Sequence, residues 1–313
     1  MAAKYQVETA CSTTSLQAGE NLAATAAHTR SWLLLEFDGI WESKALEESS
    51  LPVEVKQNLM QAQKTLPAPR FLFIKGPSGR AQPPFHFYLI RTNEDLPKMY
   101  RFLLDRYEDL LDLDIPAVLS GEPRYEARAI TDPFFTVCVN ARRDPCCAHF
   151  GAPLYQKLVK IQGQSHADWR VWQSTHVAGH RFAPNVLYFP KGLYFGRVTP
   201  DQAENLISSC LDDKLFLAYF RGRAEYKEPV QAAEIYLRRH TGSREIDAYS
   251  LTQVEESAEG VWLVRFSDRS SGVKYRIEIH QQTGDGRILQ SCGQEDPPQT
   301  TFYELTHFEM EAS

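Results

Sequence analysis

Three cysteines and two histidines in two short stretches are the residues of this sequence best suited to hold a metal. The first stretch runs from Cys138 to Cys147 and includes Cys146, and the second holds His176 and His180. Thiolate and imidazole are soft or borderline ligands, which suit zinc or an iron–sulfur cluster and do not suit magnesium or calcium. We therefore interpret the two stretches as one candidate metal or cluster site.

The spacing of these residues limits the kind of site. Cys138 and Cys147 are nine positions apart, which fits neither a Cys-x-x-Cys dithiol nor a zinc finger. A stretch of this length can curl over a 2Fe–2S cluster and supply one ligand from each end, while two imidazoles bind the other iron. His176 and His180 are four apart, as in many helical zinc sites, but the glycine between them and the proline that follows favour a loop or single turn. Spacing alone does not decide between zinc and iron–sulfur.

Two predicted strands lead directly into these stretches. Residues 133–139 are β-branched and aromatic, and residues 169–174 alternate in polarity, as strands do. A helix over 152–161 would connect them as a crossover, which places the ends of two parallel strands at the same edge of a sheet. A hairpin over 185–196 and a helix over 200–211 complete a small α/β sheet of thioredoxin-like type. We therefore expect the two stretches to meet in space.

The pattern of predicted elements divides the chain into three segments. We expect a smaller α/β domain over residues 1–122, the domain that holds both stretches over 123–223, and an α+β appendage over 224–313. In the first segment we expect residues 1–30, which are small and polar, to wrap the surface or cap a later element, and residues 96–111 to form a helix. The appendage shows no visible chemistry, and we expect it to pack rather than to react.

Cysteine usage and charge limit the function further. Six cysteines in 313 residues do not form a disulfide framework, and the clustering of three of them indicates metal or redox chemistry in a reducing compartment. The other three, Cys11, Cys210 and Cys292, are scattered, and we interpret Cys11 as an ordinary thiol. A net charge of −6 argues against a nucleic-acid binder dominated by phosphate contacts. No apolar run approaches the roughly 20 residues of a membrane helix, so we expect a cytoplasmic protein that binds neither nucleic acid nor membrane.

The two stretches resemble the motifs of the sucrase/ferredoxin-like family, whose fungal members include the actin-patch-distribution proteins. The resemblance covers most of residues 8–220 and is specific at the two motifs. It implies that residues 123–223 form a thioredoxin-like ferredoxin domain carrying a 2Fe–2S cluster with two cysteine and two histidine ligands. By motif position, the implied ligands are Cys138, Cys147, His176 and His180.

Two departures from the family pattern lie beside the implied ligands. Residues 139–141, Val-Asn-Ala, stand where Thr-His-Gly is common, and Ala178 stands where a glycine is common. Both departures affect backbone N–H groups that would surround a cluster. Cys146 remains a rival of Cys147, since adjacent cysteines point in different directions and either could reach a cluster.

We therefore predict a soluble redox protein that transfers single electrons between unidentified donor and acceptor proteins, as a carrier or as a component of an oxidoreductase. Imidazole ligands can retain a titratable N–H, so we expect reduction to be coupled to proton uptake. One alternative is a structural zinc protein with the same four ligands. Another is a thiol enzyme that uses Cys146 or Cys147, activated by Arg142 or Arg143. The sequence shows no convincing pair of glycosidase carboxylates.

Overall fold

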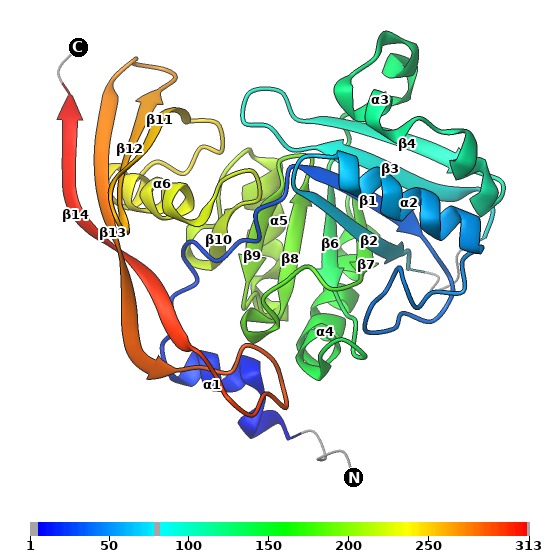
Figure 1. Cartoon of the computed structure of the whole chain (residues 1–313), viewed down its shortest axis with the longest axis horizontal. Coiled ribbons are helices and arrows are strands. Elements are labelled where there is room, and N and C mark those ends of the chain that lie inside the picture. The colour runs from blue at the N-terminus through cyan, green and yellow to red at the C-terminus, as the bar shows by residue number, and fades with distance from the viewer. Residues whose placement is uncertain (1–5, 78–81, 312–313) are drawn as a thin grey trace.

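The computed structural model describes residues 6–77 and 82–311, which form two β-sheets with helices around them (Figure 1). The larger sheet has ten strands in the order β10-β9-β8-β6-β7-β2-β1-β3-β4-β5. These strands are β1 (Ser31–Glu36), β2 (Pro69–Lys75), β3 (Phe85–Arg91), β4 (Lys98–Leu104), β5 (Ala129–Ile130), β6 (Phe134–Cys138), β7 (Arg170–Ser174), β8 (Asn185–Phe189), β9 (Leu193–Gly196) and β10 (Phe220–Arg223).

The second sheet and the helices complete the mixed α/β architecture, which confirms the predicted fold class. The second sheet contains β11 (Tyr249–Ala258), β12 (Val261–Asp268), β13 (Lys274–Arg287) and β14 (Gln299–Glu311) in that order. The helices are α1 (Cys11–Gln17), α2 (Val53–Thr65), α3 (Ile115–Ser120), α4 (Pro145–Gln162), α5 (Ala203–Leu211) and α6 (Glu228–Thr241).

The two halves of the larger sheet have the same connectivity. In each half a helix connects two parallel strands, β1 and β2 through α2, and β6 and β7 through α4. A hairpin follows, β3–β4 or β8–β9, and its first strand pairs antiparallel with the first strand of its half. The second half therefore has the predicted thioredoxin-like order. The halves meet where β2 and β7 pair antiparallel, so strands of the predicted segments 1–122 and 123–223 share one sheet. The three-domain division stays a prediction.

An aromatic core lies between the two halves. Trp32 of β1 is edge-on to Phe189 of β8, with ring centroids 5.0 Å apart, and Tyr88 of β3 packs on Phe134 of β6 at 4.9 Å. Helices α2 and α3 cover the opposite face of the first half, and α4 and α5 cover that of the second. Because both faces of β1 and β6 are buried, the sequences of these two strands are nearly continuous apolar runs rather than alternating ones.

The predicted helix over residues 96–111 is wrong. Its first part forms β4, and residues Tyr107–Asp112 form a 3-10 helix. Met99, Tyr100 and Phe102 are buried in β4, which pairs with β3 along its whole length. The leucines and charged residues of this run suit a helix, but pairing with β3 and burial against the core outweigh that local preference.

His86 of β3 is a half-buried ring where the halves meet, and it gives the stability a pH dependence. The ring is edge-on to Trp172 of β7 at 5.3 Å, and its Nδ1 has no hydrogen-bond partner among the described residues. Burial, assisted by Arg170 and Arg101, lowers the pKa of His86 from 6.5 to about 4. Between these values the unfolded chain binds a proton that the folded chain does not, so the free energy of unfolding falls as the pH drops through this window.

We expect His86→Phe, which keeps an aromatic ring, to remove this contribution. Between about pH 7 and pH 5 the wild type should lose about 1 kcal/mol more unfolding free energy than the variant, since solvent reaches part of the ring and screens its charge. Urea unfolding at the two pH values measures the difference. Equal losses in the two proteins would show that His86 already binds its proton in the folded state.

The N-terminal segment packs on the second half of the sheet before the chain enters β1. Helix α1 lies against the 3-10 turn His180–Phe182, and the Ser12 hydroxyl donates to the carbonyl of Ala183 at 2.9 Å. Arg181 of this turn forms an ion pair with Glu20 at 2.8 Å. For the residues of this segment that the structure describes, the prediction that they cap a later element is confirmed, because α1 covers the turn that contains one of the candidate histidines.

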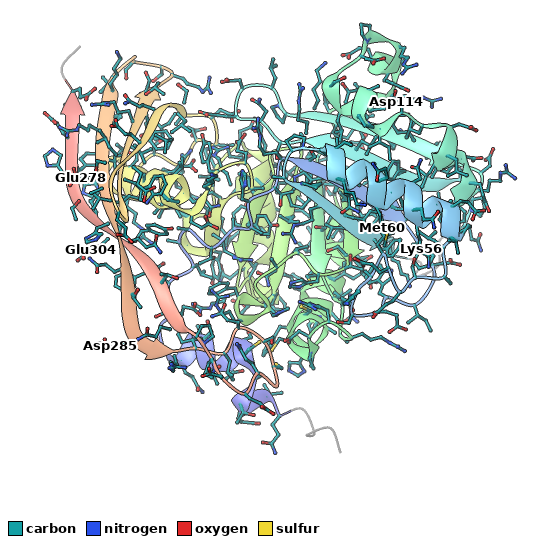
Figure 2. All side chains as sticks on the ribbon, in the orientation of Figure 1. Lys56, Met60, Asp114, Glu278, Asp285 and Glu304 are labelled. Carbon is teal, nitrogen blue, oxygen red and sulfur yellow. The ribbon has the colours of Figure 1, made fainter. Side chains whose placement is uncertain are left out.

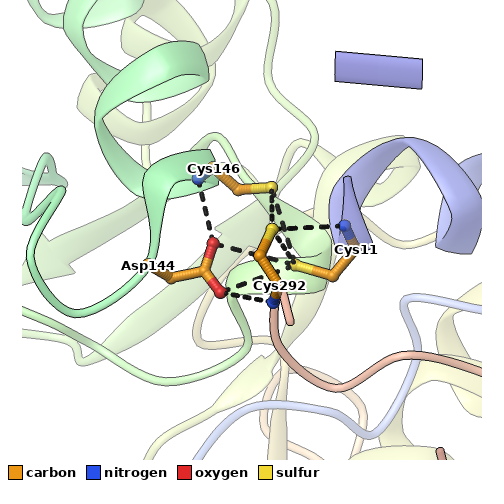
Figure 3. A group of neighbouring side chains, drawn as sticks. All are labelled: Cys11, Asp144, Cys146 and Cys292. Atoms are coloured by element: carbon orange, nitrogen blue, oxygen red, sulfur yellow. Dashed lines mark hydrogen bonds between the residues drawn. The ribbon is translucent and has the colours of Figure 1, made fainter. Parts of the chain in front are cut away.

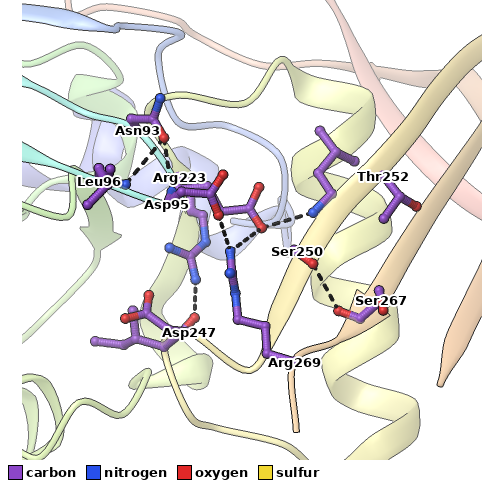
Figure 4. A network of polar contacts seen from close by, with 12 residues as sticks. Asn93, Asp95, Leu96, Arg223, Asp247, Ser250, Thr252, Ser267 and Arg269 are labelled. Atoms are coloured by element: carbon purple, nitrogen blue, oxygen red, sulfur yellow. Dashed lines mark hydrogen bonds and ion pairs between the residues drawn. The ribbon is translucent and has the colours of Figure 1, made fainter. Parts of the chain in front are cut away.

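The second sheet is tied to the first half of the larger sheet by a polar network (Figure 4). Arg269, in the turn between β12 and β13, pairs with Asp95 at 2.7 Å and with Glu94 at 3.3 Å. The backbone N–H of Leu251 donates to the Glu94 carboxylate at 2.9 Å. These contacts attach the C-terminal appendage to the link between β3 and β4.

Strands β13 and β14 are long and extend past α6 to the opposite end of the molecule, where the link between them reaches α1 (Figure 1). Charged side chains such as Glu278 and Glu304 line these strands (Figure 2). None of the helices within the described residues has the length and apolar character needed to cross a bilayer. The appendage therefore reaches from the link between β3 and β4 at one end to α1 at the other.

Candidate metal centre

The structure brings Cys138, Cys147 and His176 together. The two sulfurs and a ring nitrogen of His176 all lie within 4.8 Å of one another. The Nδ1 atom of His180 lies 3.9 Å from the Cys147 sulfur, and the His180 ring stacks on that of His176 with centroids 4.2 Å apart. All four residues predicted as ligands therefore gather in one site.

The ends of two parallel strands position this site. Cys138 is the last residue of β6, and its register partner Ser174 is the last residue of β7. The stretches that follow the two strands consequently leave the sheet side by side, as the predicted crossover requires. The backbone N–H of Thr175 then donates to the carbonyl of Phe73 in β2 at 3.0 Å, so the first half of the sheet also supports the histidine stretch.

Cys147 lies on the first turn of α4 and not in a loop, which corrects the expected start of this helix. The helix begins at Pro145, because proline suits the first helical position and Asp144 caps the turn by accepting the N–H of Cys146 at 2.9 Å. Asp144 is therefore a helix cap. Sequence reasoning placed the helix start at residue 152 because it assigned the whole cysteine stretch to a loop.

Cys146 and Cys147 are adjacent, but their side chains point to different groups. Successive residues of an α-helix are rotated by about 100° around its axis. Cys147 faces Cys138, whereas the sulfur of Cys146 lies 3.5 Å from that of Cys11 and 3.4 Å from that of Cys292. The geometry thus places Cys147, and not its rival, beside the two histidines.

Hydrogen bonds to backbone carbonyls fix the histidine stretch. The Tyr194 hydroxyl donates to the carbonyl of Val177 at 3.0 Å, and the Asn185 amide donates to that of Gly179 at 2.8 Å. Gly179 has a φ of 74° and Ala178 has a φ of 80°, both in the left-handed region. This conformation costs about 1 kcal/mol at the alanine. The side chains of the hairpin β8–β9 therefore hold this turn in a conformation that Ala178 would not adopt alone.

Arg221 of β10 is a buried cation beside this turn, and sequence reasoning missed it. Its guanidinium donates to the carbonyl of Ala178 at 3.2 Å, to Asn185 Oδ1 at 2.7 Å and to the Thr25 hydroxyl at 3.0 Å. Burial lowers the pKa of Arg221 to about 9. A Cβ at Gly179 would lie 2.4 Å from its Nη2 atom, so only glycine fits there. The sequence feature that could have indicated this role is the position of Arg221 directly after Phe220, inside a short strand.

Burial and hydrogen bonding favour the metal-binding protonation states of Cys138 and His180, whereas the hydrogen bond with Cys138, together with burial, raises the pKa of the Cys147 thiol. The pKa of Cys138 is lowered although burial opposes this. The hydrogen bond from the Cys147 thiol has the largest effect, and His176 and the backbone N–H of Val177 add smaller ones. Burial lowers the pKa of His180 to about 3. A thiolate and a neutral imidazole are the ligand forms of these side chains.

The donor set fits a 2Fe–2S cluster. Two sulfurs and two imidazoles supply the four protein ligands that such a cluster needs, two for each iron. The Nδ1 atom of His176 is buried without a hydrogen-bond partner among the described residues, as expected for a nitrogen atom that is itself a metal ligand. Arg142, a suggested activator of a cysteine nucleophile, instead pairs with Glu42 at 2.6 Å.

A cleft of about 390 Å³ opens beside His176, between the two halves of the larger sheet. Arg143 and His176 line it from the second half, and Leu46, Arg70 and Phe71 line it from the first. The histidine end of the site is therefore the end that a partner or a small molecule can approach.

The second half of the larger sheet has the thioredoxin-like order of elements, with two cysteines and two histidines at and beyond the ends of its parallel strands, as expected of the Sucrase/ferredoxin-like class. The family model described as Sucrase/ferredoxin-like matches residues 22–222, more than half of the chain, and the chain is a member of that family. Among curated proteins it is similar to Altered inheritance of mitochondria protein 32 of Meyerozyma guilliermondii, with 30% identity over 92 residues, which is 28% of this chain and 33% of that protein. The protein of the same name from Clavispora lusitaniae is 26% identical over 91 residues, again 28% and 33% of the two chains.

Each match therefore spans about a third of the length of the curated relative. Among solved structures, the chain is similar to a thioredoxin-like [2Fe-2S] ferredoxin from Aquifex aeolicus, with 15% identity and a TM-score of 0.27, covering 29% of this chain and 91% of that one. A second structure of the wild-type ferredoxin gives 17% identity and a TM-score of 0.27, covering 30% of this chain and 100% of that one.

Proposed function

We propose that this chain is an electron-transfer protein that binds a 2Fe–2S cluster through Cys138, Cys147, His176 and His180. The observation that supports this most directly is the convergence of two thiols and two imidazoles from separate stretches of the chain. Membership of the Sucrase/ferredoxin-like family supports the same cofactor. When bound, such a cluster accepts and releases single electrons.

The residues around the site would set the properties of this cofactor. The backbone N–H of Val177 points at the Cys138 sulfur, and hydrogen bonds of this kind help to set a reduction potential. Replacing two thiolates by imidazoles raises the potential, to about −150 to +300 mV in Rieske centres compared with about −400 mV in plant-type ferredoxins. The expected proton coupling stays a prediction.

The electron donor and acceptor are proposed to be proteins that approach through the cleft beside His176. The side chain of His176 lines this cleft, whereas Cys138 and Cys147 are buried. The chain would then act as a carrier or as one component of an oxidoreductase. Its expected cytoplasmic location also stays a prediction.

An absorption and EPR spectrum of anaerobically purified protein, before and after dithionite, tests the proposal. We expect visible charge-transfer bands that bleach on reduction, an EPR signal that appears with reduction, and iron and sulfide in equal amounts. A colourless protein that contains zinc at this site would support the structural zinc alternative. A metal-free protein whose activity is lost on alkylation would support the thiol-enzyme alternative.

A further inference from the structure

Cys11, Cys146 and Cys292 form a second thiol group, apart from the candidate cluster site (Figure 3). Their sulfurs form a triangle with edges of 3.5 Å between Cys11 and Cys146, 3.4 Å between Cys146 and Cys292, and 3.6 Å between Cys292 and Cys11. An oxygen of Asp144 lies 3.8 Å from the Cys11 sulfur. Helix α1, the start of α4 and the link between β13 and β14 each contribute to this group, so only the tertiary structure assembles it.

The Asp144 carboxylate at this group is buried, and backbone N–H groups hold it in place. Asp144 is 2% exposed, and its two oxygens accept the backbone N–H groups of Cys146 at 2.9 Å and Cys292 at 2.8 Å. Arg142, two positions before it in the chain, pairs with Glu42 instead. A buried carboxylate is costly unless it is paired or coordinates a metal. A metal ion among the three sulfurs would coordinate this carboxylate, which is the second of these two possibilities.

The spacing of the sulfurs suits a single tetrahedral ion. A zinc–sulfur bond of about 2.3 Å places two sulfurs of a tetrahedral site about 3.8 Å apart. The observed edges of 3.4 to 3.6 Å are close to this value, and an ion about 1 Å out of the plane of the triangle would reach all three sulfurs. A multi-iron cluster would need wider spacing, because its ligands bind different irons.

We propose that Cys11, Cys146, Cys292 and Asp144 bind one zinc ion in a structural site. The three thiols each release a proton when they bind the ion, and no electron is transferred. The proposal does not depend on the cluster, because the two sites share no ligand. The ion would fasten the N-terminal helix and the far end of the C-terminal sheet to α4, one residue before Cys147. It would thereby hold in place the helix turn that carries a proposed cluster ligand.

Metal analysis of single variants tests the zinc site. In zinc-supplemented, reduced protein we expect zinc in equimolar amount with the chain, and Cys11→Ser and Cys292→Ser should each lower zinc affinity by at least about 10–100-fold. Both variants should keep the iron of the wild type. Cys210→Ala, which changes a buried thiol of α5 outside both groups, should keep zinc and iron alike.

Several results would overturn the zinc site. One is zinc content unchanged by Cys11→Ser and Cys292→Ser. Another is a disulfide among the three cysteines in the unreduced chain, together with no zinc binding after reduction. If the variants do not fold, hydrogen exchange on the wild type gives the answer instead. Removal of zinc should raise exchange in α1 and in residues 288–298, and unchanged exchange would exclude the ion. Cys138→Ser separates the two proposals, since it should remove iron and leave zinc.

Discussion

Replacing Cys147 with serine should bleach the protein and remove its iron and sulfide, whereas the same change at the adjacent Cys146 should leave both in place. The sulfur of Cys147 lies with Cys138 and His176, while that of Cys146 faces Cys11. A serine hydroxyl is a poor substitute for a thiolate ligand. The loss of cluster affinity should therefore exceed the roughly 10–100-fold loss that is typical when a residue that only hydrogen-bonds to a metal ligand is changed. The two variants change adjacent residues of the same helix turn. A difference between them therefore depends on which way each side chain points and not on a general disturbance of this turn.

Iron and sulfide analysis and the EPR spectrum of the two reduced variants measure this difference. Circular dichroism serves as the control that both variants fold. If Cys146→Ser loses the iron and Cys147→Ser keeps it, the assignment of Cys147 as a ligand is wrong. If both keep it, the cluster lies elsewhere in the chain.

Glu234→Gln should cost about 3–5 kcal/mol of unfolding free energy, the largest effect on stability that we expect from a change outside the two metal sites. Glu234 is 2% exposed, and its Oε1 accepts from Arg223 at 2.9 Å and from Arg238 at 2.9 and 3.0 Å. Although burial opposes its charge, Arg223 and Arg238 hold the pKa of Glu234 below 4.5. The neutral glutamine would leave two buried cations without their counter-charge.

The same charges make the contribution of Glu234 to the unfolding free energy depend on pH. Because the folded pKa of Glu234 is depressed, its contribution is complete above about pH 4.5 and is lost as the pH falls through the folded value. Asp296→Asn is the matched control, since Asp296 pairs with Arg287 at 2.6 Å but its side chain is 90% exposed. Such surface pairs contribute about 1 kcal/mol or less. Urea unfolding at neutral pH compares the variants, and a loss below about 1 kcal/mol for Glu234→Gln would contradict the network.

Local sequence predicted the elements around the candidate cluster site well. The run before Cys138 is apolar and β-branched, and the run before Thr175 alternates in polarity, so both favour strands. A helix between two strands favours the parallel pair that β6 and β7 form. The prediction of a helix over residues 96–111 was wrong because the leucines and charged residues of this run are compatible with a helix as well as with a strand. Pairing with β3 decides between the two, and that pairing is a long-range contact.

The sequence by itself determined the donor types, the strands that lead into them and the family, because these depend on residue identity and short-range pattern. Only the tertiary structure decided that Cys146 faces away from Cys147, that Arg221 supports the histidine turn and that the two halves share one sheet. It also decided that Cys11 and Cys292, 281 residues apart in the chain, lie side by side. No local pattern specifies such contacts, because each of them joins segments that are far apart in the chain and meet only when the sheets and helices pack together.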